Sequence, residues 1–158
     1  MVNQSIGGLT RVQVQTTPPK NASTAVQIFE RSVQNNRFCF VEQAYLAGYL
    51  QSADYEVLHQ WYQWMELNID IEIDFIVYLQ TSPELVYERM RNRGRKEEEM
   101  VPLQYLKELH DSHETWLLGN NTAINKDCLL VINANKPLDE VLNECDLNKN
   151  IIFRKVSI

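Results

Sequence analysis

Three short apolar runs, separated by long helical stretches, constrain the fold of this chain more than any other feature. They are AVQIF at 25–29, DFIVYL at 74–79 and CLLVINAN at 128–135. Runs of this length, bounded by polar residues and rich in Val and Ile, are typical of buried strands. Strands that alternate with helices pair in parallel, because each helix carries the chain back along the sheet. We therefore predict an α/β fold, with a parallel sheet flanked by helices.

Amphipathic helical patterns fill the stretches between these runs. Residues 55–68 repeat apolar side chains at three-and-four spacing, which predicts a helix with one apolar face. Ser82 precedes Pro83, a usual start of a helix, and we expect that helix to run to about Arg93. A further helix is expected from Pro102 onward. The residues predicted to share an apolar face are Val57, Leu58, Trp61, Trp64, Met65 and Asn68 in the first helix, and Leu103, Leu106, Leu109, His113 and Trp116 in the last.

The composition suits one intracellular globular domain and argues against several functions. The chain has 158 residues, of which 44% are hydrophobic, and a formal net charge of −6. An acidic protein with a pI near 5.1 is a poor match for nucleic-acid polymers, since phosphate contacts need many cations on one surface. No apolar run approaches the roughly 20 residues that cross a bilayer, so we expect no membrane span. The three cysteines, Cys39, Cys128 and Cys145, are scattered and odd in number, which favours a reduced compartment.

Both ends of the chain are expected to lie outside the folded domain. A proline-containing break and a polar turn mark the two boundaries. We predict an irregular segment over 1–23, the domain over 24–145 and a tail over 146–158.

The first 29 residues have an unusual charge pattern. They contain Arg11 and Lys20 but no acidic residue, and they are rich in Ser, Thr, Gln and Asn. Such a composition fits an organellar transit peptide, and it also fits a polar loop that leads into a strand. We expect a cytoplasmic protein, with a mitochondrial one as the alternative.

A cluster of positive charge follows the second apolar run. The sequence YERMRNRGRKEEE at 87–99 holds four arginines and a lysine, followed at once by three glutamates. In one interpretation the arginines form a solvated helix end, favoured by the helix dipole, with the glutamates as counter-ions. In the other, Gly94 is the hinge of a mobile lid whose arginines stabilise phosphoryl transfer. The glutamates would then either restrain the open lid or bind a substrate hydroxyl.

Five motifs carry a family resemblance by their order and spacing. They are FERSV at 29–33, RFCFVE at 37–42, VYLQTSPE at 77–84, RNRGRKEEE at 91–99 and PLQYLKELHDSHETWL at 102–117. Together they resemble the carboxyl-terminal two thirds of the deoxyribonucleoside kinases, the family that contains mitochondrial thymidine kinase and the insect multisubstrate enzyme. The resemblance implies a P-loop-kinase-like parallel sheet, here without its first strand. It also implies transfer of the ATP γ-phosphate to the 5′-hydroxyl of a deoxynucleoside, with Mg²⁺, by a homodimer.

The resemblance gives roles to three residues of the first two motifs. Glu30 would lie near the metal ion and the phosphates, Arg31 would approach the 5′ end of the substrate, and Phe40 would stack on the base. Taken without the family, Phe40 suits an ordinary core position and Arg31 suits a structural ion pair at the end of a strand. The matching order of the motifs favours the functional roles.

The arginine cluster receives roles in the same way. Arg93 and Arg95 would be lid arginines on the ATP phosphates, and Glu98 would bind the 3′-hydroxyl of the sugar. The resemblance therefore implies that the arginines bind phosphates and that a glutamate binds the sugar.

The sequence departs from the family pattern at the phosphate-binding loop. None of its five glycines lies in a GxxxxGKS or GxxxxGKT motif, and the family's general-base glutamate has no counterpart here. We therefore expect a deoxynucleoside kinase without its amino-terminal third, and the activity of this chain alone is left open.

Two further residues bear on the choice of base. Gln4, in NQSIGGLT at 3–10, is the candidate counterpart of the family's base-reading glutamine. Asn36 occupies the position at which pyrimidine-preferring relatives carry a small residue and purine-preferring relatives an acid. The sequence FVEQ at 40–43 resembles the thymidine kinases of the family more than its other members. We therefore expect a pyrimidine deoxynucleoside as substrate.

The aromatic helix at 55–68 supports a second hypothesis. It predicts a non-catalytic binding or dimerisation protein that pairs through this helix with a full-length kinase. The same stripe also suits an ordinary core face.

Overall fold

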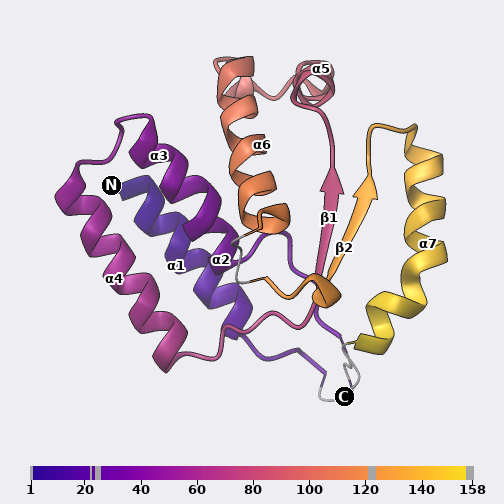
Figure 1. Cartoon of the computed structure of the whole chain (residues 1–158), viewed down its shortest axis with the longest axis horizontal. Helices are drawn as coiled ribbons and strands as arrows, with labels where there is room; N and C mark the ends of the chain where they lie inside the picture. The colour runs from indigo at the N-terminus through magenta and orange to yellow at the C-terminus, as the bar shows by residue number, and fades with distance from the viewer. Residues whose placement is uncertain (1, 22, 24–25, 121–123, 156–158) are drawn as a thin grey trace. The chain divides into compact units, whose positions relative to one another are not determined.

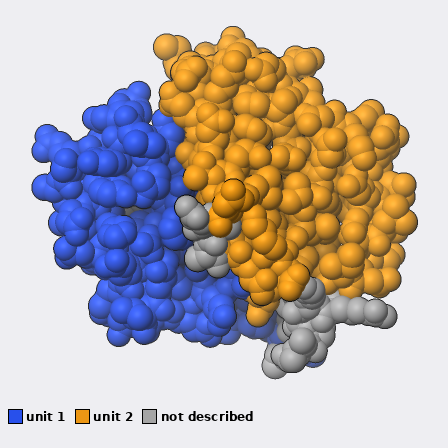
Figure 2. Space-filling model, in the orientation of Figure 1, with its two compact units in different colours: residues 1–73 blue, residues 74–158 orange. Residues whose placement is uncertain are grey.

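The computed structural model describes residues 2–21, 23, 26–120 and 124–155, with side chains described from residue 8 to residue 153 within these ranges. The chain divides into two compact units, residues 1–73 and residues 74–158, which are coloured separately in Figure 2. None of the described helices is long and apolar enough to cross a membrane.

Unit 1 is built from helices (Figure 1). Its elements are α1 (Val2–Thr16), α2 (Val33–Asn35), η1 (Asn36–Val41), α3 (Glu42–Leu46) and α4 (Ser52–Asn68). The middle three follow one another without a break, so that residues 33–46 form one helical run whose centre, η1, is π-helical. The buried side chains that form the core of this unit are Val33, Val41, Ala44, Leu50, Leu58, Tyr62, Met65 and Ile71.

Helix α4 confirms the helix predicted at 55–68 but buries a different face. Leu58, Tyr62 and Met65 are spaced i, i+4, i+7 and point into the core. Trp61 and Trp64, predicted on the apolar face with Leu58, are 52% and 55% exposed. Apolar residues lie on more than one side of this helix, and packing against the neighbouring helices selects the stripe that contains Tyr62.

The irregular segment predicted over 1–23 is wrong for residues 2–16, which form helix α1. The helix forms although it contains two glycines, Gly7 and Gly8, and glycine costs about 1 kcal/mol in a helix interior. Gly8 is buried, and a Cβ atom there would lie 3.1 Å from the Tyr62 hydroxyl. The absence of a side chain therefore allows α1 to pack closely, and Val12 packs against the core one turn later. Tertiary packing outweighs the low propensity.

The strand predicted at 25–29 is wrong for residues 26–29, which have no regular secondary structure. Ile28 is 80% exposed. A strand needs a hydrogen-bonded neighbour, and within residues 2–21, 23 and 26–73 there is none for it. Residue 25 lies outside the described residues.

Unit 2 contains a parallel pair of strands with helices around it. Its elements are β1 (Ile76–Gln80), α5 (Pro83–Arg93), η2 (Lys96–Glu98), α6 (Leu103–Leu118), η3 (Lys126–Cys128), β2 (Leu129–Asn133) and α7 (Leu138–Lys155). Strands β1 and β2 pair in parallel, in a register that runs from Ile76 opposite Leu129 to Gln80 opposite Asn133. The second and third predicted strands and their parallel pairing are confirmed.

The two faces of this sheet are covered by different helices. Ile132 is fully buried and packs with Val141 of α7. Side chains alternate along a strand, and Tyr78 lies next to Leu79, the register partner of Ile132. Tyr78 therefore points to the opposite face, where it contacts Glu114 of α6. Helix α7 continues to Lys155, so residues 146–155 of the predicted tail are helical.

Candidate functional site

An arginine-rich segment connects helices α5 and α6. Helix α5 begins at Pro83, after Ser82 in extended conformation, and ends at Arg93. Gly94 follows in the left-handed conformation, with φ of 66°, which glycine adopts without steric cost. The predicted end of this helix is confirmed. We name residues 94–101 the lid segment.

Glu98 contacts two guanidinium groups at this segment. Arg93 Nη2 donates to Oε1 and Oε2 of Glu98 at 2.8 and 2.9 Å, and Arg95 Nη1 lies 3.8 Å from Oε1. The arginine side chains are 51% and 62% exposed, whereas that of Glu98 is 24% exposed. The structure thus brings these three predicted site residues together. The glutamate pairs with the arginines, a contact that both the counter-ion interpretation and the restrained-lid interpretation predict.

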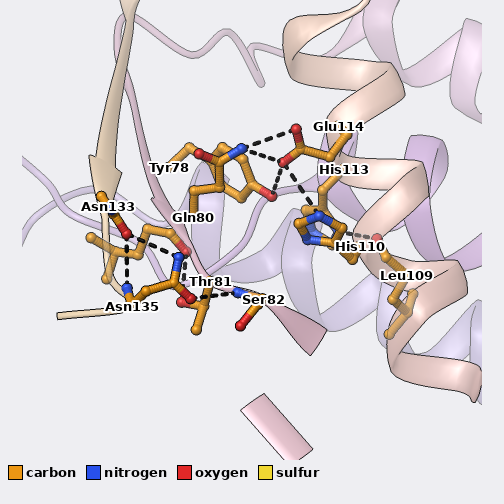
Figure 3. Close-up of polar contacts among 11 residues, drawn as sticks. Tyr78, Gln80, Thr81, Ser82, Leu109, His110, His113, Glu114, Asn133 and Asn135 are labelled. Carbon is orange, nitrogen blue, oxygen red and sulfur yellow. Dashed lines mark hydrogen bonds and ion pairs between the residues drawn. The ribbon is translucent and has the colours of Figure 1, made fainter. Parts of the chain in front are cut away.

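A hydrogen-bond network fixes α6 to strand β1 (Figure 3). The Glu114 carboxylate accepts from the Tyr78 hydroxyl at 2.8 Å and from Gln80 Nε2 at 2.8 and 3.0 Å. His110 Nε2 lies 3.9 Å from the same carboxylate, and the ring of His113 stacks on that of Tyr78. These contacts hold the helix that follows the lid segment against the carboxyl end of β1.

A second set of contacts joins helix α5 to the loop after β2. The Ser82 backbone N–H donates to Asn135 Oδ1 at 2.8 Å. Arg89 donates to the carbonyl oxygens of Ala134 and Lys136 at 2.8 and 3.0 Å. Both helices that flank the lid segment are therefore anchored at the carboxyl edge of the sheet, the edge at which parallel α/β sheets bind ligands.

In unit 1, Arg31 has an unusual backbone conformation. Among the described residues it is the one non-glycine residue with positive φ, at 67°. Its guanidinium group lies 4.5 Å from the centre of the Phe40 ring, a cation–π contact. Ser32 then caps the helical run, because its Oγ accepts from the Asn35 N–H at 3.0 Å. Left-handed non-glycine residues concentrate at functional sites, where surrounding contacts hold the strain.

Glu30 precedes this turn, and its side chain is exposed. Its carbonyl oxygen accepts a hydrogen bond from the Arg11 guanidinium of helix α1. The contact holds the backbone next to Arg31 and leaves the Glu30 carboxylate facing solvent.

Asn36 and Phe40 both lie in the π-helical segment η1. Asn36 Nδ2 donates to the Tyr62 hydroxyl at 2.6 Å, and the same hydroxyl lies close to Gly8. Single π-helical turns inside helices occur often at functional sites, because they change the direction of the side chains. Phe40 is partly buried.

Comparison with known proteins gives this arrangement a context. The deoxynucleoside kinase family profile matches residues 4–156. The chain is 37% identical over 130 residues to mitochondrial thymidine kinase 2 of Homo sapiens, a match that covers 82% of this chain and 49% of the relative. It is 35% identical over 144 residues to deoxycytidine kinase 2 of Gallus gallus, covering 84% and 54%. With deoxycytidine kinase of Homo sapiens the identity is 38% over 112 residues, covering 70% and 43%.

The chain belongs to the deoxynucleoside kinase family. This confirms the resemblance inferred from the five motifs, and the helix-rich α/β structure with its small parallel sheet agrees with the fold of that family. The chain spans about half the length of the curated relatives it matches.

The site residues predicted for this deoxynucleoside kinase family member fall into two groups, one in each unit. Within unit 1 the structure brings Arg31 onto Phe40. Within unit 2 it brings Arg93 and Arg95 onto Glu98. The Gln4 side chain lies outside the described residues. The remaining predicted residues, Glu30 and Asn36, contact helices α1 and α4.

Sequence reasoning missed a buried charge in this chain. Arg37, in RFCFVE, donates from Nη1 to Glu66 Oε2 at 2.6 Å, and its Nη2 lies 3.1 Å from His59 Nε2. Its side chain is 11% exposed. The partners are 22 and 29 positions further along the chain, on α4. An arginine in an otherwise apolar helical motif was the one signal available. The partners of Arg89 and Glu114 likewise lie 45 and 34 positions away in the sequence, so local patterns did not predict them.

Two further side chains buried in unit 1, Cys39 and Tyr62, carry groups that could lose a proton. Burial raises the pKa of the Cys39 thiol to about 12, although the charge of Arg31 acts in the opposite direction. Burial also raises the pKa of Tyr62. Both groups keep their protons at neutral pH, so neither supplies a nucleophile. Among the residues with described side chains, no three His, Cys, Asp or Glu residues are arranged to hold a metal ion.

Proposed function

We propose that this chain acts in a deoxynucleoside kinase that transfers the γ-phosphate of ATP to the 5′-hydroxyl of a deoxynucleoside, with pyrimidines preferred. The observation that carries the proposal is the lid segment. In a chain of this family, two exposed arginines stand on either side of a left-handed glycine and share one glutamate.

The chemistry of this arrangement suits a polyphosphate. The phosphoryl-transfer transition state spreads negative charge over several oxygens, and arginine binds such oxygens through fixed N–H donors. Arg93 and Arg95 would hold ATP phosphates, and Glu98 would accept a hydrogen bond from the 3′-hydroxyl of the sugar. Gly94 would allow the segment to close and to exclude water.

The contacts in unit 1 support a nucleoside site. Phe40 would stack on the base, and Arg31, strained and held on the Phe40 ring, would approach the 5′-hydroxyl. Asn36 is neutral and fixed by Tyr62, so the position carries no carboxylate of the kind found in purine-preferring relatives. This supports the choice of a pyrimidine.

The proposed reaction requires ATP and Mg²⁺. The exposed lid arginines fit the triphosphate, because their donors are not buried in the core. Mg²⁺ takes most of its ligands from phosphates and water, and one exposed carboxylate such as that of Glu30 is enough to bind it. When bound, the ion would neutralise phosphate charge. No GxxxxGKS or GxxxxGKT motif occurs in the sequence, so a backbone cradle for the phosphates has to come from another segment.

Phosphorylation of radiolabelled thymidine by the isolated chain with MgATP is the direct test. Product formation would establish the activity for the chain itself. If none forms, the DNA upstream of the Met1 codon should encode an in-frame phosphate-binding loop, and the longer protein should be active. Finding neither activity nor such a loop would refute the proposal.

In the active form, Arg93→Ala and Arg95→Ala should lower kcat more than they weaken nucleoside binding, because lid arginines act mainly on charge that develops during transfer. Lys149→Ala removes the same charge from helix α7 and is the matched control. Unchanged kcat in both lid variants would remove these arginines from the mechanism. Glu98→Ala should weaken the preference for a 3′-hydroxyl.

A second candidate function is self-association through helix α4. Val57, Trp61 and Trp64 are spaced i, i+4, i+7 and are each more than half exposed. A continuous apolar stripe of this kind can pair with its own copy across a twofold axis. The proposed partner is a second copy of this chain, and a full-length kinase of the same family is the alternative.

Sedimentation velocity at micromolar concentration tests this second function. The wild-type chain should sediment as a dimer and the Trp61→Ala, Trp64→Ala double variant as a monomer. Gln63→Ala, an exposed polar position of the same helix, should stay dimeric. A monomeric wild-type chain that also fails to co-purify with a full-length kinase would exclude both partners.

The compartment belongs with these proposals. The matched relatives named as mitochondrial include thymidine kinase 2 of Homo sapiens and deoxyguanosine kinase of Xenopus laevis. Their names support the mitochondrial alternative over the cytoplasmic expectation, and immunofluorescence with a mitochondrial marker would distinguish the two.

A further inference from the structure

The lid segment is held against the last turn of helix α5. Arg93 donates to both carboxylate oxygens of Glu98, Arg95 lies within ion-pair distance, and Arg91 Nη1 donates to the Glu99 carbonyl oxygen at 2.9 Å. The two arginines proposed to bind phosphate, Arg93 and Arg95, are therefore paired with Glu98, the residue proposed to bind the sugar.

The local backbone selects Glu98 from three consecutive glutamates. The 3₁₀ turn η2 ends at Glu98, whose N–H donates to the Arg95 carbonyl at 3.0 Å. Its own carbonyl accepts from the Val101 N–H at 3.1 Å. This places the Glu98 side chain against the last turn of α5, while Glu97 and Glu99 are exposed. The contact with Arg93 is thus a feature of the fold of the segment rather than of its net charge.

A polyphosphate competes well for these arginines. An ion pair as exposed as this one contributes little net free energy, because water solvates both partners when it opens. Phosphate oxygens carry more charge than one carboxylate and match the guanidinium donors. Whatever binds Arg93 more strongly than Glu98 does also sets the Glu98 carboxylate free.

We infer that Glu98 is an internal ligand of the lid arginines that the phosphate donor must displace, and that its release makes it available to the nucleoside. The inference rests on the proposed function and adds a direction to it, since donor binding promotes sugar binding by an exchange of partners. By linkage the nucleoside strengthens donor binding by the same factor. The strength of an exposed ion pair limits that factor to about two- to fivefold.

Titration of the isolated chain with inorganic triphosphate tests the exchange without any phosphoryl transfer. In calorimetry at low ionic strength, Glu98→Gln should bind triphosphate about two- to fivefold more tightly than the wild-type chain. Glu97→Gln changes the net charge by the same amount at the neighbouring position, and it serves as the matched control. A Glu98→Gln affinity no higher than that of Glu97→Gln, or no binding by any of the three proteins, would overturn the inference.

Hydrogen–deuterium exchange gives a second readout. Without ligand, residues 91–99 of Glu98→Gln should exchange faster than in the wild-type chain and in Glu97→Gln. Equal exchange in all three would also count against the inference. The two proposals can fail separately. If the kinase is active but Glu98→Gln does not bind triphosphate more tightly, only the role of Glu98 as an internal ligand is refuted. If Glu98→Gln binds triphosphate more tightly but neither the chain nor a longer form phosphorylates thymidine, the proposed function is refuted.

Discussion

Replacing Arg31 by glycine and by alanine measures the strain at the proposed nucleoside site. At φ of 67° a residue with a Cβ atom is strained by about 1 to 2 kcal/mol, which glycine avoids. Glycine loses about 0.5 to 1 kcal/mol through its more flexible unfolded state. Both variants lose the cation–π contact with Phe40, worth about 0.5 to 1 kcal/mol at an exposed site. We therefore expect Arg31→Gly to be close to the wild-type chain in stability, and Arg31→Ala to be less stable than Arg31→Gly by about 0.5 to 1 kcal/mol.

Urea unfolding followed by circular dichroism measures this difference. For m-values of about 2 kcal/mol/M, the glycine midpoint should lie about 0.3 to 0.5 M above that of alanine. Arg11, inside helix α1, is the control position, where glycine should be the less stable of the two variants. If alanine equals or exceeds glycine at position 31, Arg31 is not held in the left-handed region, and the argument for strain at this site is refuted.

Three further predictions concern Gly94 and the core of unit 1. Gly94→Ala should lower the free energy of unfolding by about 1 kcal/mol, because φ of 66° then carries a Cβ atom, and a thermal melt will show whether it does. Arg37→Met should cost about 1.5 to 3 kcal/mol by removing a charged hydrogen bond to Glu66, and Arg37→Lys should cost less; equal urea midpoints for the two would contradict the role of the charge. The pKa of Cys39 is raised from 9.0 to about 12, so the folded thiol keeps a proton that the unfolded chain loses, and stability should fall as the pH rises through that window by about 1.4 kcal/mol per pH unit. Cys39→Ala removes this contribution, and a pH dependence identical to wild type would show that the thiol is not buried.

The sequence predicted correctly those helices and strands whose ends are determined by residues close to them in the chain. Helix α5 is the clearest case, since Pro83 at its first turn and the left-handed Gly94 after its last residue mark its two ends, although the Ser82 side chain makes no capping hydrogen bond. Strands β1 and β2 were predicted because their short apolar runs contain Val and Ile and are bounded by polar residues.

The failures have a common physical origin in packing. Helix α1 forms although it contains glycines, because Gly8 lies against the hydroxyl of Tyr62, a residue far along the chain. The run at 26–29 has the composition of a strand, but backbone pairing needs a neighbour that unit 1 does not supply in its described part. Propensity is a local quantity, and each of these outcomes depends on a distant partner.

For the site, the sequence by itself determined the chemical types and their order, which was enough to identify the family and to locate the arginines, the glycine between them and the glutamates. Only the tertiary structure decided that Glu98, of three glutamates, contacts Arg93, that Arg31 is left-handed and lies on Phe40, and that the tryptophans of α4 face solvent. The reason is that a pattern records which groups are present, whereas contacts depend on backbone turns and on competition among all the partners within reach.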